Sequence, residues 1–354
     1  MRTAIALLAI LGGVALSAQQ PRPATPTDPV GLIVEALKTH QVVGFSDPHG
    51  DRALDEFELA VVRDPRIRQA IDDIVIENGN ARFQSAVDAY VNGDAVPYEQ
   101  LHHAWHDTTQ VQTIGPRDGS IPIIFRVVRE LNASAKPPAR RIRVLLGDPP
   151  IDWTAVQTPQ DHRRWIEQRD THGADVVRRE VLDKRHHALV VYGQGHLQRR
   201  SQGFNYSSEG LAATVASGIE AAAPGQLFTL WWLTDRKAPP QETNAWPAPG
   251  AALVRGTTLG ALDFTAFEEI GIRGKITGTQ LAPVPRDEWK TMRMEDQFDA
   301  VLKLDHLPAV PPAAGNPAAM CADTEWVAEW IRRLTLGGGP NAGVAQRLRD
   351  TCKL

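Results

Sequence analysis

Short apolar runs recur along the chain, and each has the composition expected of a buried strand. They are rich in Val, Ile, Leu and aromatic residues and are bounded by polar or turn-forming residues. The runs span residues 41–46, 72–78, 141–148, 187–196, 226–235 and 298–305. Because runs of this kind lack polar alternation, they predict strands that are covered on both faces.

Longer stretches with the spacing of amphipathic helices separate most of these runs. They span residues 53–63, 81–92, 98–106, 121–133 and 159–184. Strands that alternate with helices form βαβ units, and the strands of such units are parallel. The pattern therefore predicts an α/β fold with a doubly wound, mostly parallel sheet flanked by helices.

The last third of the chain departs from this alternation. Residues 239–285 are rich in Gly, Pro and short apolar pieces, which predicts an irregular insertion or an edge hairpin. The stretch DTEWVAEWIRRLTL predicts a helix with Asp323 as its N-cap, and GGGP at 337–340 stops that helix. Residues 322–354 are therefore expected to form a C-terminal helical cap.

The N-terminus has the pattern of a secretory signal peptide over residues 1–18. One Arg precedes an apolar run, small residues follow the run, and the run is too short to span a bilayer. The Pro-rich residues 19–30 predict a tether, so residues 31–354 are expected to form a single domain. We therefore expect an exported protein, either periplasmic or secreted.

Charge and cysteine content narrow the range of partners. The chain has 38 basic and 42 acidic residues without a basic block, which disfavours nucleic acid as a partner, and no later segment is apolar enough to cross a membrane.

The two cysteines, Cys321 and Cys352, flank the last helical stretch. In an oxidising compartment a disulfide between them would stabilise the fold by about 3 to 4 kcal/mol, and two free thiols are the alternative. The oligomeric state does not follow from the sequence.

Acids, amides and imidazoles follow the ends of four predicted strands. In an open parallel sheet the ligand crevice lies beyond the carboxyl ends of the strands, so side chains at these ends meet at one rim. Those with suitable chemistry are Asp47, His49, Glu77, Asn78, Asp148, Gln194 and His196. Each alone has an ordinary explanation, such as a helix cap or a structural hydrogen bond. Because four strands deliver an acid or an imidazole to one rim, we expect an active or binding site there for a small molecule or a peptide.

This set of side chains suits the activation of water for hydrolysis of an ester or amide, with His49, Glu77 and His196 as the expected catalytic residues. A divalent metal would lower the pKa of its bound water, whereas without metal an imidazole would act as general base beside an orienting acid. The candidate metal ligands are Asp47, His49, Glu77, Asp148 and His196. Asn78 and Gln194 are expected to position the substrate. The spacing of the residues leaves both routes open, because the ligands come from distant strands.

Three short motifs stand at these strand ends. The first strand runs into acid-x-His-Gly from Asp47 to Gly50, the second ends in Glu77, and a later G-x-x-H ends in His196. Their order resembles the erythromycin esterase, ChaN and TIKI superfamily, and RVLLGDPPIDW and YVNGDAVPYEQLHHAWHDTT resemble an exported ChaN-like subgroup. The resemblance covers about residues 35–235 and implies a site formed by Asp47, His49, Glu77 and His196. The first acid of that superfamily is usually Glu.

The same resemblance implies a different class of function as an alternative. Members of the superfamily include metal-dependent proteases, a macrolide esterase and an iron-uptake protein that binds haem. A non-enzymatic haem or iron-binding protein of the ChaN type would use Tyr192 and His196 as axial ligands. The chain has no C-x-x-C-H, which excludes covalently attached haem.

Two further patterns compete with these interpretations. GFSDP approximates the G-x-S-x-G elbow of a serine hydrolase, with Ser46, Asp148 and His196 in the usual chain order. His102 and His106 are four residues apart on a predicted helix and suit either a shared metal or a solvated helical face.

Overall fold

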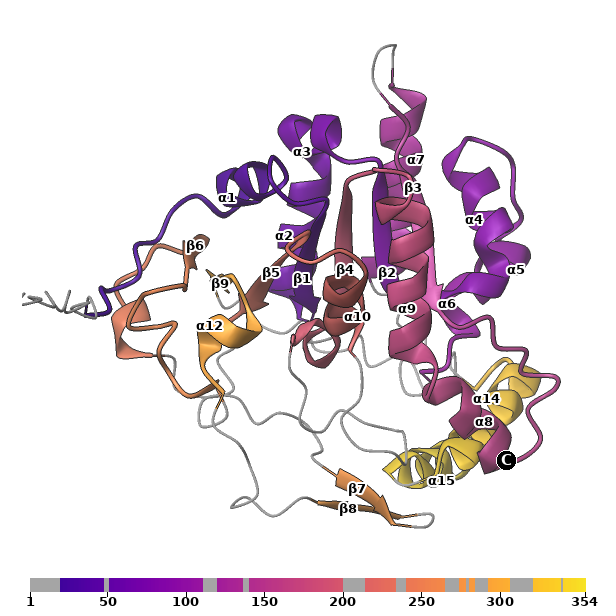
Figure 1. Cartoon of the computed structure of the whole chain (residues 1–354). Helices are drawn as coiled ribbons and strands as arrows, with labels where there is room; N and C mark the ends of the chain where they lie inside the picture. The colour runs from indigo at the N-terminus through magenta and orange to yellow at the C-terminus, as the bar shows by residue number, and fades with distance from the viewer. Residues whose placement is uncertain are drawn as a thin grey trace, which may run out of the picture.

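A seven-stranded sheet with the order β3-β2-β4-β1-β5-β9-β6 forms the centre of the protein (Figure 1). The strands are β1 (Val42–Asp47), β2 (Asp73–Asn80), β3 (Arg143–Asp148), β4 (Ala188–Gly193), β5 (Leu227–Trp232), β6 (Gly250–Leu253) and β9 (Ala300–Lys303). Neighbouring strands are parallel except for β6, which is antiparallel to β9. The predicted α/β fold with a mostly parallel sheet is therefore confirmed.

The computed structural model describes residues 20–47, 51–110, 120–135, 140–199, 214–233, 240–264, 274–277, 280–283, 292–305, 321–338 and 340–354. The predicted signal peptide at residues 1–18 lies outside them. In the part of the chain that is described, no helix has the length and apolar character needed to span a membrane.

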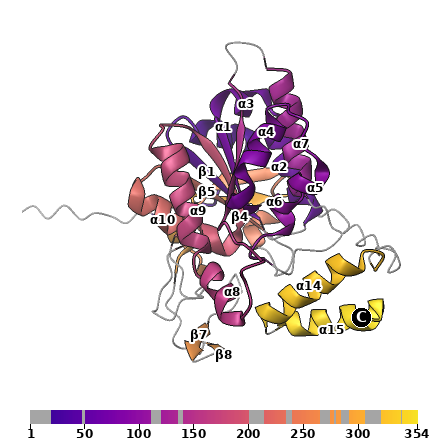
Figure 2. The same ribbon diagram turned by 90° about the vertical axis from the view of Figure 1, so that its right-hand side faces the viewer.

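Helices cover both faces of the sheet because the strands are apolar on both sides (Figure 2). Val43 and Phe45 of β1 belong to the core on one face, and Val42 belongs to the core on the other. The first face packs against α1 (Pro29–Ala36), α2 (Arg52–Arg63), α3 (Pro65–Ala70), α4 (Gln84–Val91), α5 (Tyr98–Leu101), α6 (His103–His106) and α7 (Ser120–Ala133). The second packs against α9 (Arg169–Val177) and α10 (Val215–Ala222).

Several predicted elements are shorter or more broken than the sequence pattern suggests. The predicted helix at 159–184 is divided into α8 (Pro159–Ile166), α9 and the π-turn η2 (Arg178–Leu182). The fourth predicted strand ends at Gly193, and the next residues form the 3-10 turn η3 (Gln194–Leu197). The region 81–92 begins with the 3-10 turn η1 (Ala81–Phe83) before α4. These breaks place polar residues at element ends rather than on continuous faces.

The C-terminal cap is a hairpin of α14 (Thr324–Gly337) and α15 (Pro340–Cys352). Asp323 caps α14 as predicted by accepting a hydrogen bond of 2.9 Å from the backbone N–H of Trp326. Helix α14 ends at the predicted stop, where Gly338 has a φ of 63° that suits glycine. A disulfide joins Cys321 to Cys352. The hairpin packs on Ile151 and Trp153, so it lies at the end of the protein where the strands finish (Figures 1 and 2).

The described parts of the predicted insertion at residues 239–285 contain only short elements. They are η4 (Gln241–Thr243), β6, and a two-stranded antiparallel pair, β7 (Gly274–Thr277) with β8 (Gln280–Pro283), and α12 (Met294–Gln297) follows the insertion. Strand β6 forms one edge of the main sheet. Thr27, in the predicted tether, exchanges backbone hydrogen bonds of 2.8 and 3.0 Å with Ala251 of β6. The segment before α1 therefore contacts the folded part of the chain.

Candidate active site

Glu77 lies at the centre of a buried charged cluster at the carboxyl ends of the strands. The register of β2 against β3 shifts between Ile76 and Asn80, and Glu77 lies in this irregular stretch with 4% of its surface exposed. The side chains of Arg169 and Gln110 donate hydrogen bonds to its Oε1, and the backbone N–H of Gly193 donates to its Oε2. One carboxylate thereby joins β2, the end of β4 and the start of α9.

His196 is held between two carboxylates. Its Nδ1 lies 2.8 Å from Oδ1 of Asp170, and its Nε2 lies 3.2 Å from Oε1 of Glu77. Burial alone would lower the pKa of His196, but the negative charges of Asp170 and Glu77 and their hydrogen bonds raise it to about 10. At neutral pH the ring is therefore an imidazolium that donates from both nitrogens, and the side chain is 6% exposed.

Asp148 forms a second acidic position of the cluster, at the end of β3. Its Oδ2 accepts a hydrogen bond of 2.7 Å from the backbone N–H of Thr109, and its Oδ1 accepts one of 2.6 Å from the Thr109 hydroxyl. Nε of Arg169 lies 3.7 Å from Oδ1. Burial raises the pKa of Asp148 to about 7, although Arg169 and Thr109 act in the opposite direction. Asp148 therefore titrates near neutral pH.

The structure thus brings together Glu77, Asp148 and His196, which the sequence predicts to share one rim. Asp47 ends β1 in backbone register with Gly193, so β1 finishes beside the cluster. The side chain of Asp47 is outside the described residues, and so is His49. Their predicted roles stay predictions.

Two residues of the cluster, Arg169 and Asp170, are not among those predicted from the sequence. Both stand at the start of α9, within a stretch that was predicted as one helix from 159 to 184. Asp170 also accepts a hydrogen bond of 3.0 Å from the backbone N–H of Val215, the first residue of α10. An Arg-Asp pair in a charged helical pattern looks like a solvated face, and only the break after Ile166 turns it into a helix start that faces the strand ends.

Asn78 and Gln194, the predicted substrate-positioning residues, each keep a buried polar atom that finds no hydrogen-bond partner within the described part of the chain. The atoms are the side-chain oxygen of Asn78 and the side-chain nitrogen of Gln194. Asn78 follows Glu77 directly, and Gln194 follows Gly193, whose N–H binds Glu77. Buried amide groups of this kind need a partner, which a substrate can supply. Their predicted role therefore stays open as a proposal.

Tyr192 does not suit the predicted role of a haem ligand. Its hydroxyl is wedged so closely between Gly147 and Gly173 that a Cβ on either glycine would collide with it. Burial, together with the charges of nearby carboxylates, raises the pKa of Tyr192 well above 10, so the phenolate that would bind iron is disfavoured. The other predicted ligand, His196, uses both ring nitrogens for Glu77 and Asp170. The described arrangement therefore leaves no open axial pair at these two residues.

Three of the predicted metal ligands lie in the described residues, and they form ion pairs with one another or with Arg169. They are Glu77, Asp148 and His196. Within the described ranges, no group of three or more His, Cys, Asp or Glu residues is arranged to hold a metal ion. Both ring nitrogens of His196 are paired with carboxylates, so a metal at His196 would have to displace a ring proton and one of these partners. Asp47 and His49 fall outside this comparison because their side chains are not described.

The contacts of the described residues also bear on the two competing sequence patterns, the serine triad and the histidine pair. A serine triad would orient His196 with Asp148, but His196 is held by Asp170 and Glu77 while Asp148 binds Thr109. The rings of His102 and His106 meet edge to face at 5.0 Å in an aromatic cluster, where Tyr98 stacks on His102. These two histidines therefore take part in ring packing.

Comparison with models of known protein families gives no match, and comparison with curated proteins gives none either. Solved structures that are similar to this chain include a succinoglycan biosynthesis protein, with 10% identity and a TM-score of 0.49, covering 79% of this chain and 94% of that one. A mutant of the erythromycin esterase EreC in its open conformation has 11% identity and a TM-score of 0.47, and the match covers 79% of this chain and 94% of that one. ChaN of Campylobacter jejuni with cofacial haem has 11% identity and a TM-score of 0.38, and the match covers 59% of this chain and 87% of that one. Two of these proteins, EreC and ChaN, bear the names of the superfamily that the sequence motifs resemble.

Proposed function

We propose that this chain hydrolyses an ester or an amide of a small molecule or peptide at the carboxyl ends of β1, β2 and β4. The observation that carries the proposal is the buried array Glu77–His196–Asp170, in which one imidazolium lies between two carboxylates. Removing such charges from water costs several kcal/mol unless each is paired, and proteins concentrate such arrangements at functional sites. Arg169 adds a second cation against the same carboxylate.

Hydrolysis requires a base that takes a proton from water and positive charge where the oxyanion develops. His196 already carries both ring protons at neutral pH and donates them to Glu77 and Asp170, so it suits neither the base nor a direct contact with the oxyanion. We therefore assign the positive charge to Arg169. We assign the general base to His49, which the sequence motif places two residues beyond Asp47. Glu77 then fixes the imidazolium and the Arg169 guanidinium in position, and Asn78 and Gln194 are proposed to hold the substrate.

The charges of the cluster favour the route without metal. A divalent ion at Glu77 would have to sit beside the Arg169 guanidinium, which would repel it, and would have to displace a proton from His196. Elemental analysis of protein purified without chelator checks this choice. We expect no stoichiometric metal in the wild type. A stoichiometric metal that is lost from His49→Ala would contradict the metal-free route and restore His49 as a ligand.

Hydrolysis of p-nitrophenyl esters and of peptide p-nitroanilides tests the activity. His49→Ala is expected to lower kcat by at least about 100-fold, because a general base contributes that much or more. His40→Ala is the matched control: His40 precedes β1 by two residues, as His49 follows it by two, and lies at the opposite end of the strand. A wild type that cleaves none of these substrates, or a His49→Ala variant as active as His40→Ala, would end the proposal.

We further propose that the protein acts outside the cytoplasm. The signal-like pattern of residues 1–18 and the joining of Cys321 to Cys352 support export. Mass spectrometry of protein recovered from the periplasm or medium is expected to give a mature N-terminus after Ala18. A chain that keeps residues 1–18 would contradict export through this signal.

A further inference from the structure

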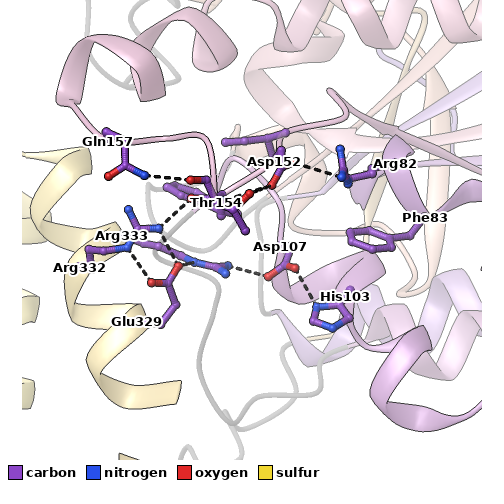
Figure 3. A pocket seen from close by; sticks show the side chains of 12 residues that line it. Arg82, Phe83, His103, Asp107, Asp152, Thr154, Gln157, Glu329, Arg332 and Arg333 are labelled. Carbon is purple, nitrogen blue, oxygen red and sulfur yellow. Dashed lines mark hydrogen bonds and ion pairs between the residues drawn. The ribbon is translucent and has the colours of Figure 1, made fainter. Parts of the chain in front are cut away.

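A pocket of about 520 Å³ lies between α14 of the C-terminal hairpin and the loop that follows β3 (Figure 3). Its walls come from η1, α6, the loop after β3, and α14. Neither Glu77 nor His196 lines it, so it is separate from the candidate active site. Its volume falls in the range of pockets that bind small organic molecules.

Aromatic rings line two parts of this pocket. Phe83 and His103 stack with their ring centroids 5.3 Å apart and a tilt of 20°. Trp153 lies elsewhere in the lining, with the guanidinium of Arg333 4.9 Å from its ring centroid. In Figure 3, Phe83 and His103 lie on one side of the pocket, and α14, which carries Arg333, lies on the other. Such surfaces favour a ligand that contains a planar ring.

Both arginines of α14 that line the pocket already bind acceptors of the protein. Arg332 donates to both oxygens of Glu329 and to the carbonyl oxygens of Val156 and Trp153. Arg333 donates to Glu329 and, over 2.7 Å, to Asp107. These groups hold the hairpin against the domain, so they form a rigid wall and leave little capacity for a ligand.

Arg82 differs from the other two. Within the described residues its ion pair is with Asp152 alone, at 3.1 Å, and its side chain is 51% exposed. Exposed ion pairs of this kind contribute little free energy, so a ligand carboxylate can compete for the guanidinium. The planar fork of an arginine binds a carboxylate through two parallel hydrogen bonds.

We propose that this pocket binds a small planar aromatic carboxylate, with the ring on the aromatic lining and the carboxylate on Arg82. The proposal does not depend on the hydrolytic function. One segment connects the two sites, because Asp107 lines the pocket while Gln110, three residues later, binds Glu77. Because the proposal does not depend on hydrolysis, ligand binding to the pocket can be measured on the whole protein without a substrate.

Titration of the whole protein with 2-naphthoate, followed by calorimetry, tests the proposal. We expect saturable binding with one site per chain and about 10-fold weaker binding of the neutral 2-naphthamide, because a charge-assisted hydrogen bond is lost. Arg82→Gln is expected to weaken naphthoate binding by about 10-fold and to remove the preference over the amide. Arg63→Gln, an exposed arginine on α2 outside the pocket, serves as the control and should bind as the wild type does.

The side chain of Arg82 is half exposed, so its replacement is expected to leave the unfolding temperature unchanged, which a thermal melt checks. An Arg82→Gln variant that folds and binds naphthoate as tightly as the wild type would overturn the proposal. So would naphthoate and naphthamide binding equally well to the wild type, or an absence of saturable naphthoate binding.

Discussion

Both ends of the sheet carry an acid paired with an imidazole, but the two ends are built differently. At the amino end, Oδ2 of Asp73 lies 2.8 Å from Nδ1 of His186, and His186 is 32% exposed. At the carboxyl end, His196 is 6% exposed and lies between Glu77 and Asp170. The first is one acid with one half-buried ring, whereas the second is a closed array with a further cation, Arg169, on Glu77.

The surroundings explain the difference. Asp72, beside Asp73, accepts a backbone hydrogen bond of 3.0 Å from His187 and pairs with the exposed Arg140, so the acids at the amino end fasten a loop. At the carboxyl end, side chains from β2, η3 and α9 converge on one point. An acid with an imidazole is therefore an ordinary structural pair, and convergence of several elements on it is what indicates a functional site.

Substitutions at the two ends of the sheet are expected to differ most in their effect on kcat. Glu77→Gln is expected to lower kcat at least about 100-fold, because it weakens the hold on His196 and Arg169. Asp73→Asn, at the amino end, is expected to leave kcat unchanged and to reduce only the free energy of unfolding. Steady-state kinetics on both variants, with thermal melts to confirm folding, makes the measurement. Equal losses of kcat in the two variants would show that the ends do not differ in function.

The next effect is the pH dependence of stability. Because the pKa of His196 is raised to about 10 in the folded state, its contribution to stability is complete below about pH 6.5 and is lost as the pH rises through about 10. The midpoint of urea unfolding is therefore expected to fall more steeply between pH 7 and 10 in the wild type than in His196→Gln. Parallel profiles for wild type and His196→Gln would show that the imidazolium does not exist.

Asp148 adds a smaller effect in a lower pH window. Its folded-state pKa of about 7 lies above the ordinary value, so its protonated form favours folding below about pH 3.8 and this contribution is lost as the pH rises through about 7. Asp148→Asn keeps an oxygen for the Thr109 N–H and cannot ionise. Unfolding measurements between pH 4 and 8 should give a flatter profile for this variant than for the wild type. An unchanged profile would mean that Asp148 is already ionised across the window.

The smallest effect is expected at the exposed edge of the amino end. Arg140 pairs with Asp72 across 2.5 Å, but its side chain is 72% exposed, and water screens such a pair. Arg140→Gln is therefore expected to leave the unfolding midpoint within experimental error of the wild type. A large shift would mean that the amino end is held together by this charge rather than by the backbone bond from His187 to Asp72.

The strands were predictable because each buried run is continuous and apolar, and their parallel arrangement brings Glu77, Asp148 and His196 to one rim. Asp51 shows the limit of this inference: it follows the first strand like the others but caps α2, accepting from Ala53 and Leu54. An acid near a strand end can thus be a cap, and the sequence alone does not separate the two.

Arg169 and Asp170 were missed for a physical reason. No Gly or Pro marks the break between α8 and α9, so the charged pattern from 159 to 184 reads as one solvated helix. The position of Asp170 is fixed instead by tertiary contacts, through the ring of His196 and the first N–H of α10. Such contacts join residues far apart in the chain and leave no local pattern in the sequence.

The proposed site depends above all on the protonation state of His196. Side-chain ¹⁵N NMR of the folded protein, with the signal assigned by its loss in His196→Gln, reports whether each ring nitrogen carries a proton. We expect both nitrogens of His196 to stay protonated from pH 6 to above pH 9. A neutral ring with one unprotonated nitrogen at pH 7.5 would contradict this expectation.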